Sequence, residues 1–143
     1  MTVKKVAAAA AILFTSTAAP AAAPPNPFQS DHTMANQPLV VPEGPLQVNV
    51  ETTVLKITDK IPVHMHFWPR YVYVQKGTVE VTLIDSKVTQ QFSTGDVIVE
   101  PIGLWHKGAV IAAPAILVSV EQVPPGRVNK IEPPACDCPP PRR

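Results

Sequence analysis

The chain has 143 residues, with 12 Lys and Arg against 11 Asp and Glu, and 18 prolines. This nearly neutral balance gives no electrostatic reason to expect binding to nucleic acid or to an anionic membrane surface. The length allows one small domain. An all-β domain of this size must close its sheet or cover its edge strands with a partner subunit, so a homodimer is expected.

Residues 1–22 have the pattern of a Sec-type secretory signal peptide. A basic start precedes an apolar run over 6–14, and small residues follow. The apolar run is about half of the ~20 residues that a membrane span needs. We expect cleavage after Ala18, Ala21 or Ala22, no membrane span in the mature chain, and a periplasmic or secreted bacterial protein.

Residues 23–45 are rich in Pro, Asn, Gln and Ala and show no sustained period, which predicts a disordered leader. His32 lies in this segment and is expected to be solvated and without a role.

Residues 46–123 carry the pattern of an all-β domain. Short runs rich in Val, Ile, Thr and Tyr alternate with Gly, Pro, Asp and Lys at intervals that are typical of an antiparallel sandwich or barrel. The expected strands are 47–58, 62–66, 71–75, 78–84, 88–92, 97–100, 107–112 and 115–122. Gly77 is expected to form a tight hairpin turn before Thr78.

Residues 124–143 form a proline-rich tail, which is expected to be extended and exposed because proline lacks the amide donor that pairing requires. Cys136 and Cys138 lie in it. The tail offers two thiols where a structural zinc site needs four ligands, so we expect a mobile oxidised pair. A link to another chain and a pair of metal-binding thiols are the alternatives.

Two histidines lie two positions apart in the predicted strand 62–66. Successive side chains of a strand alternate, so His64 and His66 project from one face while Met65 faces the other way. Such a pair can share one ion, although alone it is a weak signal. A third imidazole, His106, follows a turn, a buried strand and a second turn that begin at Gly95.

In these residues the chain resembles the cupin superfamily. The matching positions are His64, His66 and Gly77 in the first motif of that family, and Gly95, Pro101, Gly103 and His106 in the second. The resemblance implies a double-stranded β-helix, or jelly-roll barrel, in which His64, His66 and His106 bind one divalent transition metal. Imidazole ligands suit Fe, Zn, Mn, Ni and Cu alike, so the metal is not identified. Gly103 suits a positive φ that turns His106 toward the barrel interior.

The sequence departs from the family pattern at the fourth metal ligand. Arg70 stands where the family has a ligand glutamate, and Thr58 and Val110 replace two further motif residues. At ~4 Å and an effective dielectric constant of ~20, a cation would repel the metal by ~4 kcal/mol. Arg70 therefore cannot be a metal ligand.

Three interpretations of Arg70 remain open. In the first, it binds a carboxylate or another anion that is itself bound at a three-histidine metal site. In the second, it points outward beside Trp68 and Tyr71. In the third, the metal has been lost and the histidines form an anion-binding or structural cluster with Arg70.

The remaining candidates for a site are aromatic or acidic. Trp68, Tyr71 and Trp105 flank the motifs, so with Arg70 they are predicted substrate-binding residues, although strand aromatics often serve packing. Glu80 and Glu100 have no assignable partner and are expected on solvated faces.

Two functions follow from this pattern. The first is a metal-dependent cupin enzyme, an oxygenase or isomerase that acts on a small anionic molecule. The second is a non-catalytic periplasmic module that binds a small molecule or a metal, because one fold hosts many activities. A structural envelope protein that docks through its proline-rich tails is a third interpretation.

Overall fold

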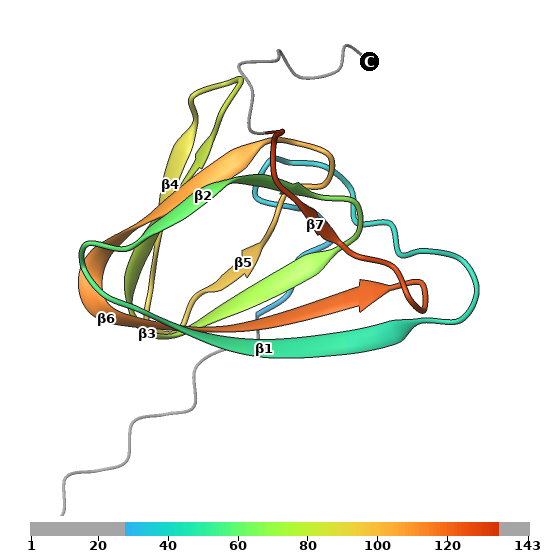
Figure 1. Ribbon diagram of the computed structural model, residues 1–143, viewed down its shortest axis with the longest axis horizontal. Helices are drawn as coiled ribbons and strands as arrows, with labels where there is room; N and C mark the ends of the chain where they lie inside the picture. Colours follow the sequence, from blue (N-terminus) through green and yellow to red (C-terminus); the bar gives the residue numbers. More distant parts are fainter. Residues whose placement is uncertain (1–27, 135–143) are drawn as a thin grey trace, which may run out of the picture.

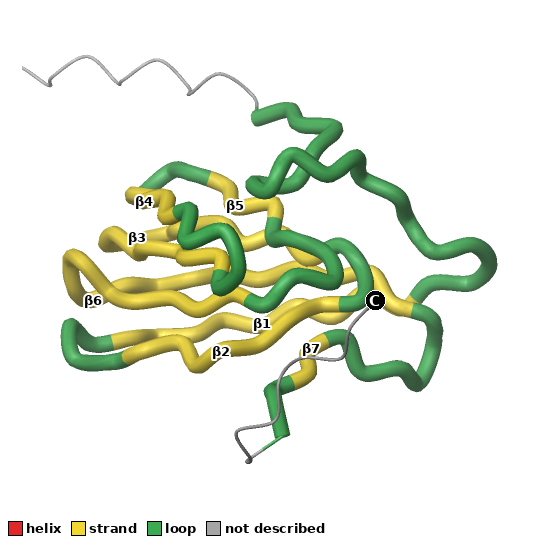
Figure 2. Tube along the Cα trace, turned by 90° about the horizontal axis from the view of Figure 1, so that it is seen from above, coloured by secondary structure: helices red, strands yellow, loops and turns green. Residues whose placement is uncertain are grey.

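The computed structural model describes residues 28–134. The predicted signal peptide over 1–22 and both cysteines, Cys136 and Cys138, lie outside the described residues. Within the described part, Figure 2 shows only strands and loops. In residues 28–134 no helix has the length and apolar character that a membrane crossing requires.

Seven strands make up the domain, and all strand pairs are antiparallel. The strands are β1 (Gln47–Leu55), β2 (Lys60–His66), β3 (Arg70–Leu83), β4 (Thr89–Ser93), β5 (Val97–Val99), β6 (His106–Val123) and β7 (Lys130–Ile131).

Two long strands, β3 and β6, pair along their whole length and bend together. The first part of β3 pairs with β5 and its last part with β4. The end of β6 pairs with β1 and its start with β2. The strands therefore form two sheets, β5-β3-β6-β1 and β4-β3-β6-β2-β7, which face each other in Figure 1. This is the jelly-roll fold that the sequence predicts.

The bend corrects the prediction of a hairpin turn at Gly77. Residues 71–75 and 78–84 are two halves of one strand, β3, and the register shifts at Gly77, which has a φ of 84°. A Cβ atom there would lie 2.5 Å from the carbonyl oxygen of Ala112. Glycine is required because β6, likewise one strand where two were expected, passes so close to β3 at the corner.

The core lies between the two sheets. Val79, Val81 and Leu83 are buried, while Glu80 and Thr82 between them are partly exposed, as the predicted alternation requires. Fully burying an aliphatic side chain of this kind contributes about 1.5–3 kcal/mol. Val74 and Ile98 extend the same cluster. The outer face of β1 stays exposed, and the homodimer remains a prediction.

The two segments outside the sheets are more ordered than their composition suggests. Thr33 is buried, and the amide of Met34 donates to the carbonyl of Val99. This part of the N-terminal segment thus differs from the disordered leader expected over 23–45. The tail expectation is wrong for Asn129, which is buried, and for β7, which pairs with β2. Non-proline residues in these segments keep the amides that such contacts need.

Candidate metal centre

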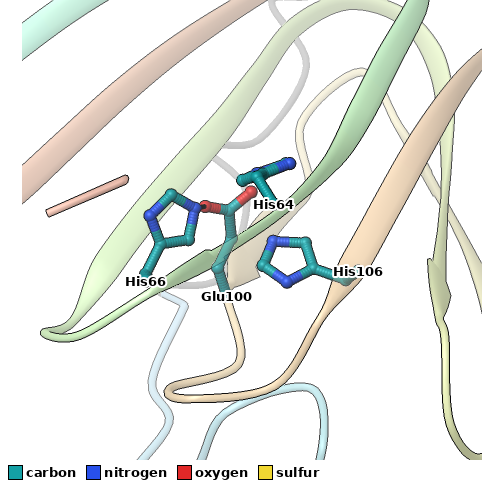
Figure 3. A group of neighbouring side chains, drawn as sticks. All are labelled: His64, His66, Glu100 and His106. Carbon is teal, nitrogen blue, oxygen red and sulfur yellow. Dashed lines mark ion pairs between the residues drawn. The ribbon is translucent and has the colours of Figure 1, made fainter. Parts of the chain in front are cut away.

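Three histidines converge inside the barrel. His64 and His66 project from the inner face of β2, and His106 begins β6 directly opposite His64 in the register. Their ring centroids lie 4.3 Å apart for His64 and His106, and 5.3 Å apart for His66 and His106. The predicted convergence of the three rings is confirmed (Figure 3).

Backbone carbonyl groups orient two of the three rings. Nδ1 of His64 lies 2.7 Å from the carbonyl oxygen of Pro62, and Nδ1 of His106 lies 2.9 Å from that of Leu104. A carbonyl can only accept, so each Nδ1 carries the proton and each Nε2 keeps a free lone pair. This arrangement prepares a histidine to bind a metal through Nε2.

Gly103 supplies the turn that brings His106 into place. Its φ is 67°, and its amide donates to the carbonyl of His66 at 2.7 Å. The predicted role of this glycine is therefore confirmed, since His106 is buried at the interior end of the loop.

A carboxylate completes the group. Glu100 directly follows β5, and only 8 % of its surface is exposed. The expectation that it lies on a solvated face is wrong, because Ile98 and Glu100 share the inner face of the same extended segment. The ligand atoms of the metal-ligand cluster (His64, His66, Glu100 and His106) all lie within 4.8 Å of one another. Two ligands of one ion, each at about 2.0–2.2 Å, lie up to ~4.4 Å apart, so small shifts suffice to share an ion.

Four buried polar atoms of this cluster lack hydrogen-bond partners. These atoms are both ring nitrogens of His66, Nε2 of His106 and Oε2 of Glu100. His66 Nε2 and Glu100 Oε2 approach to 2.8 Å, but not with hydrogen-bond geometry. An unsatisfied buried polar atom costs about 1–3 kcal/mol, so four in one place require an explanation. Nitrogen and carboxylate donors fit a divalent transition metal, which would satisfy the atoms that face it.

The pKa values favour the ligand forms of these groups. Burial lowers the pKa of His64 to about 4 and also lowers the pKa of His106, so both rings are neutral at pH 7. Burial alone would raise the pKa of Glu100. The close contact with His66 and the positive charge of Arg70 outweigh burial and lower this pKa to about 2. His64 and His106 therefore present neutral imidazoles beside one carboxylate.

Arg70 lies beside the cluster and is held by protein groups. Its Nε lies 3.2 Å from Glu100 Oε2, its Nη1 3.3 Å from Glu121 Oε2, and its Nη2 donates to Ser119 Oγ at 2.8 Å. Glu51 lies 3.7 Å from Nη2. Arg70 points inward, as in the first interpretation, but the anions it contacts are carboxylates of the chain itself.

Asn129 extends this polar network into the C-terminal segment. Its Oδ1 accepts from the amides of Phe67 and Trp68, and its Nδ2 donates to Glu121 Oε2 at 3.1 Å. We call Arg70, Ser119, Glu121 and Asn129 the Arg70 cluster. It fixes the turn that follows His66.

The N-terminal segment also supports the site, through Gln37. Gln37 Nε2 donates to the carbonyl of Ile102 at 2.8 Å, and Gln37 Oε1 accepts from the amide of Ile102 at 3.0 Å. Thr33, which is buried, in turn donates to Gln37. Ile102 lies between Glu100 and His106, so Gln37 holds the loop that connects two members of the metal-ligand cluster.

A cavity of about 260 Å³ opens beside the cluster. His64, Glu100 and Arg70 line it, and most of its other lining residues are aliphatic. Trp68, Tyr71 and Trp105 are not among its lining residues, and Trp68 borders a surface hollow with Phe67 instead. The substrate-binding role of the three aromatic residues therefore remains a prediction without support from this cavity.

Glu100 is the site residue that sequence reasoning missed. The signal was available, because Glu100 directly follows the apolar run 97–99 and lies two positions after Ile98. In the structure, its amide also donates to the carbonyl of Arg70 at 2.9 Å, so the two residues are direct neighbours across β3 and β5. A carboxylate on the adjacent strand thus stands in for the one missing at position 70.

The family model of the cupin domain matches residues 50–121, and the chain belongs to this family. The match contains the whole metal-ligand cluster. Gln37 and Asn129 lie outside it. No curated protein sequence is significantly similar to the chain.

Solved structures share the fold. The chain is 24 % identical to an oxalate decarboxylase from Lactobacillus farciminis, with a TM-score of 0.51, and the match covers 59 % of this chain but 26 % of that one. It is 17 % identical to a protein from Bacillus halodurans, with a TM-score of 0.50 and coverage of 57 % and 67 %. A cupin-2 domain protein from Shewanella frigidimarina is 17 % identical, with a TM-score of 0.42 and coverage of 58 % and 76 %. The chain thus spans about a quarter of the decarboxylase.

Proposed function

We propose that the protein binds one divalent transition metal through His64, His66, Glu100 and His106 and acts on a small molecule bound at that metal. The observation that carries this proposal is the set of buried donor atoms that converge without hydrogen-bond partners. Iron, zinc, manganese, nickel and copper all suit three imidazoles and one carboxylate.

A metal ion that takes more than four ligands would keep open positions beside these four residues, at which it would polarise an oxygen ligand or activate dioxygen. The activity we propose is therefore that of a metal-dependent oxygenase or isomerase. The residues of the chain supply the frame: two carbonyls hold the proton on Nδ1 of His64 and His106, and Arg70 keeps Glu100 ionised. Arg70 already contacts Glu100, Glu121 and Ser119, so its predicted role in binding an anionic substrate stays a prediction.

Metal content tests the proposal directly. Protein prepared without chelators, or reconstituted with each of the five metals, should hold about one equivalent by elemental analysis. Glu100→Gln should weaken metal binding, whereas Glu80→Gln, on the partly exposed face of β3, should not. Less than a tenth of an equivalent after every reconstitution would overturn the proposal.

A non-catalytic binding module is the second candidate. It is favoured by the cavity lining, in which every acidic or basic group near the histidines is already engaged: Glu100 and Arg70 contact each other, and Ser119 accepts from Arg70. The other charged lining residues, Glu51, Lys60 and Lys130, are exposed, so no buried lining residue outside the metal-ligand cluster is placed to act as a general base. Turnover by the metal-loaded protein that is lost in His106→Ala would exclude this candidate.

We also propose that the protein is exported, on the basis of the basic, apolar and small-residue pattern of 1–22. Sequencing the N-terminus of protein secreted or released from the periplasm would test this. A mature chain that begins after Ala18, Ala21 or Ala22 is the expected result, and an uncleaved chain would contradict it.

A further inference from the structure

The cavity beside the metal-ligand cluster has polar groups at one end, where His64, Glu100 and Arg70 lie, and an aliphatic wall over most of the rest. The aliphatic members of its lining are Leu55, Ile61, Val72, Val79, Val81, Ile98 and Leu117. Five of these seven belong to the rigid core between the sheets. Side chains fixed in a close-packed core cannot rearrange to present polar groups, so the wall is permanently apolar.

The volume of the cavity sets the size of its occupant. An apolar cavity of about 150 Å³ holds a benzene molecule, so the observed cavity of about 260 Å³ holds roughly ten non-hydrogen atoms. A two-carbon dianion would fill a small part of this space. It would leave the aliphatic wall without contacts, and so would gain nothing from it.

The polar groups of the cavity fix the number of charged ends that a ligand can have. Arg70 contacts Glu100, Glu121 and Ser119. Its charge is thus already neutralised by carboxylates of the chain. Three further charged residues, Glu51, Lys60 and Lys130, line the cavity, and all three are exposed, so they lie where it opens to solvent. A second anionic group in the interior, between the metal and this opening, would face aliphatic side chains, where an unpaired charge is strongly disfavoured.

From the size, the apolar wall and the engaged arginine, we infer that the ligand carries one oxygen-donor group, which binds at the metal-ligand cluster, on an apolar body of about six or seven heavy atoms that packs against Leu55, Ile98 and Leu117. This inference rests on the proposed function for the donor group. The apolar body depends on the cavity alone.

Methyl-detected NMR titration tests both parts separately. Protein with labelled Ile, Leu and Val methyl groups is titrated with acetate, cyclohexanecarboxylate, cyclohexane-1,4-dicarboxylate and oxalate, in the metal-free and the zinc-loaded state. Cyclohexanecarboxylate should shift the methyl signals of Ile98 and Leu117 in both states, and should bind the zinc-loaded protein at least tenfold more tightly than acetate, oxalate or the dicarboxylate. Weak binding to both states alike, with the cavity methyl signals still shifted, supports the apolar body while removing the metal-bound donor group.

Two variants on β1 serve as a matched pair. Leu55 faces the cavity, and its neighbour Val54 is 64 % exposed on the opposite face. Leu55→Asn should reduce the preference for cyclohexanecarboxylate over acetate at least threefold, and Val54→Asn should leave it unchanged. If Leu55→Asn does not fold, the titration of the unaltered protein decides alone. The inference is overturned if the cavity methyl signals do not move in either state, or if oxalate or the dicarboxylate binds as tightly as cyclohexanecarboxylate.

Discussion

The metal-ligand cluster and the Arg70 cluster lie side by side in one barrel, and Glu100 contacts both. In the Arg70 cluster, the guanidinium, the Ser119 hydroxyl, the Glu121 carboxylate and the Asn129 amide all have partners. In the metal-ligand cluster, four buried atoms have no hydrogen-bond partner. A network in which every polar group has a partner stabilises the fold. Buried polar atoms without hydrogen-bond partners destabilise it unless a ligand such as a metal ion binds them.

The largest effect is expected when the satisfied network is broken. Arg70→Met leaves Glu100 and Glu121 without their shared cation, which should lower the free energy of unfolding of the metal-free protein by about 3 kcal/mol. Urea denaturation measures this change. Lys60→Met, at the exposed edge of the same cavity, is the control and should change stability by less than ~0.5 kcal/mol. Equal effects of the two variants would show that the Arg70 cluster is not a stabilising network.

Substitution in the metal-ligand cluster should weaken metal binding without lowering the stability of the metal-free protein. His106→Leu removes a metal ligand. Loss of a residue that only hydrogen-bonds to a ligand can lower metal affinity ~100-fold, so the loss here should be at least as large. Because Leu buries no orphaned nitrogen, the metal-free variant should be at least as stable as the unaltered protein. A chelator competition assay and urea denaturation provide the two readouts. A large loss of stability with metal affinity retained would reverse the roles of the two clusters.

The pH dependence of stability sharpens the comparison further. The pKa of His64 falls from its ordinary value of 6.5 to about 4 in the folded protein. Between these values the unfolded chain binds a proton that the folded chain does not, so stability of the metal-free protein falls as pH decreases from 6.5 to about 4. His64→Gln should flatten this slope in thermal unfolding, and His32→Gln, a surface variant, should not. An unchanged slope in His64→Gln would contradict the assignment.

The smallest effect on metal binding is expected at Gln37, which lies outside the residues that match the family model. Gln37→Ala removes both hydrogen bonds to Ile102. Metal affinity should fall about tenfold, as for loss of other outer supports of a metal site. The number of bound metal ions should not change. Gln91→Ala, which removes an exposed contact with Glu80, is the control. If both variants bind metal equally well, Gln37 does not position the loop.

Much of the fold could be predicted because a strand that buries one face needs an apolar residue at every second position. The alternation in 79–83 and the spacing of His64 and His66 both follow from it, and both hold in the structure. The continuity of β3 and β6 could not be predicted in this way. A glycine that turns a hairpin and one that lets two strands cross at a corner look the same in sequence.

The sequence by itself determined that three imidazoles face the interior of a small β-domain, because the face of a strand residue and the turn at Gly103 are local properties. Only the tertiary structure decided which residue supplies the carboxylate and what Arg70 does. Both depend on the pairing of β3 with β5, which places Glu100 beside Arg70 although 30 positions separate their numbers. The partner of a buried charge depends on distance in space, and Glu100 and Arg70 come within contact distance only when β3 and β5 pair.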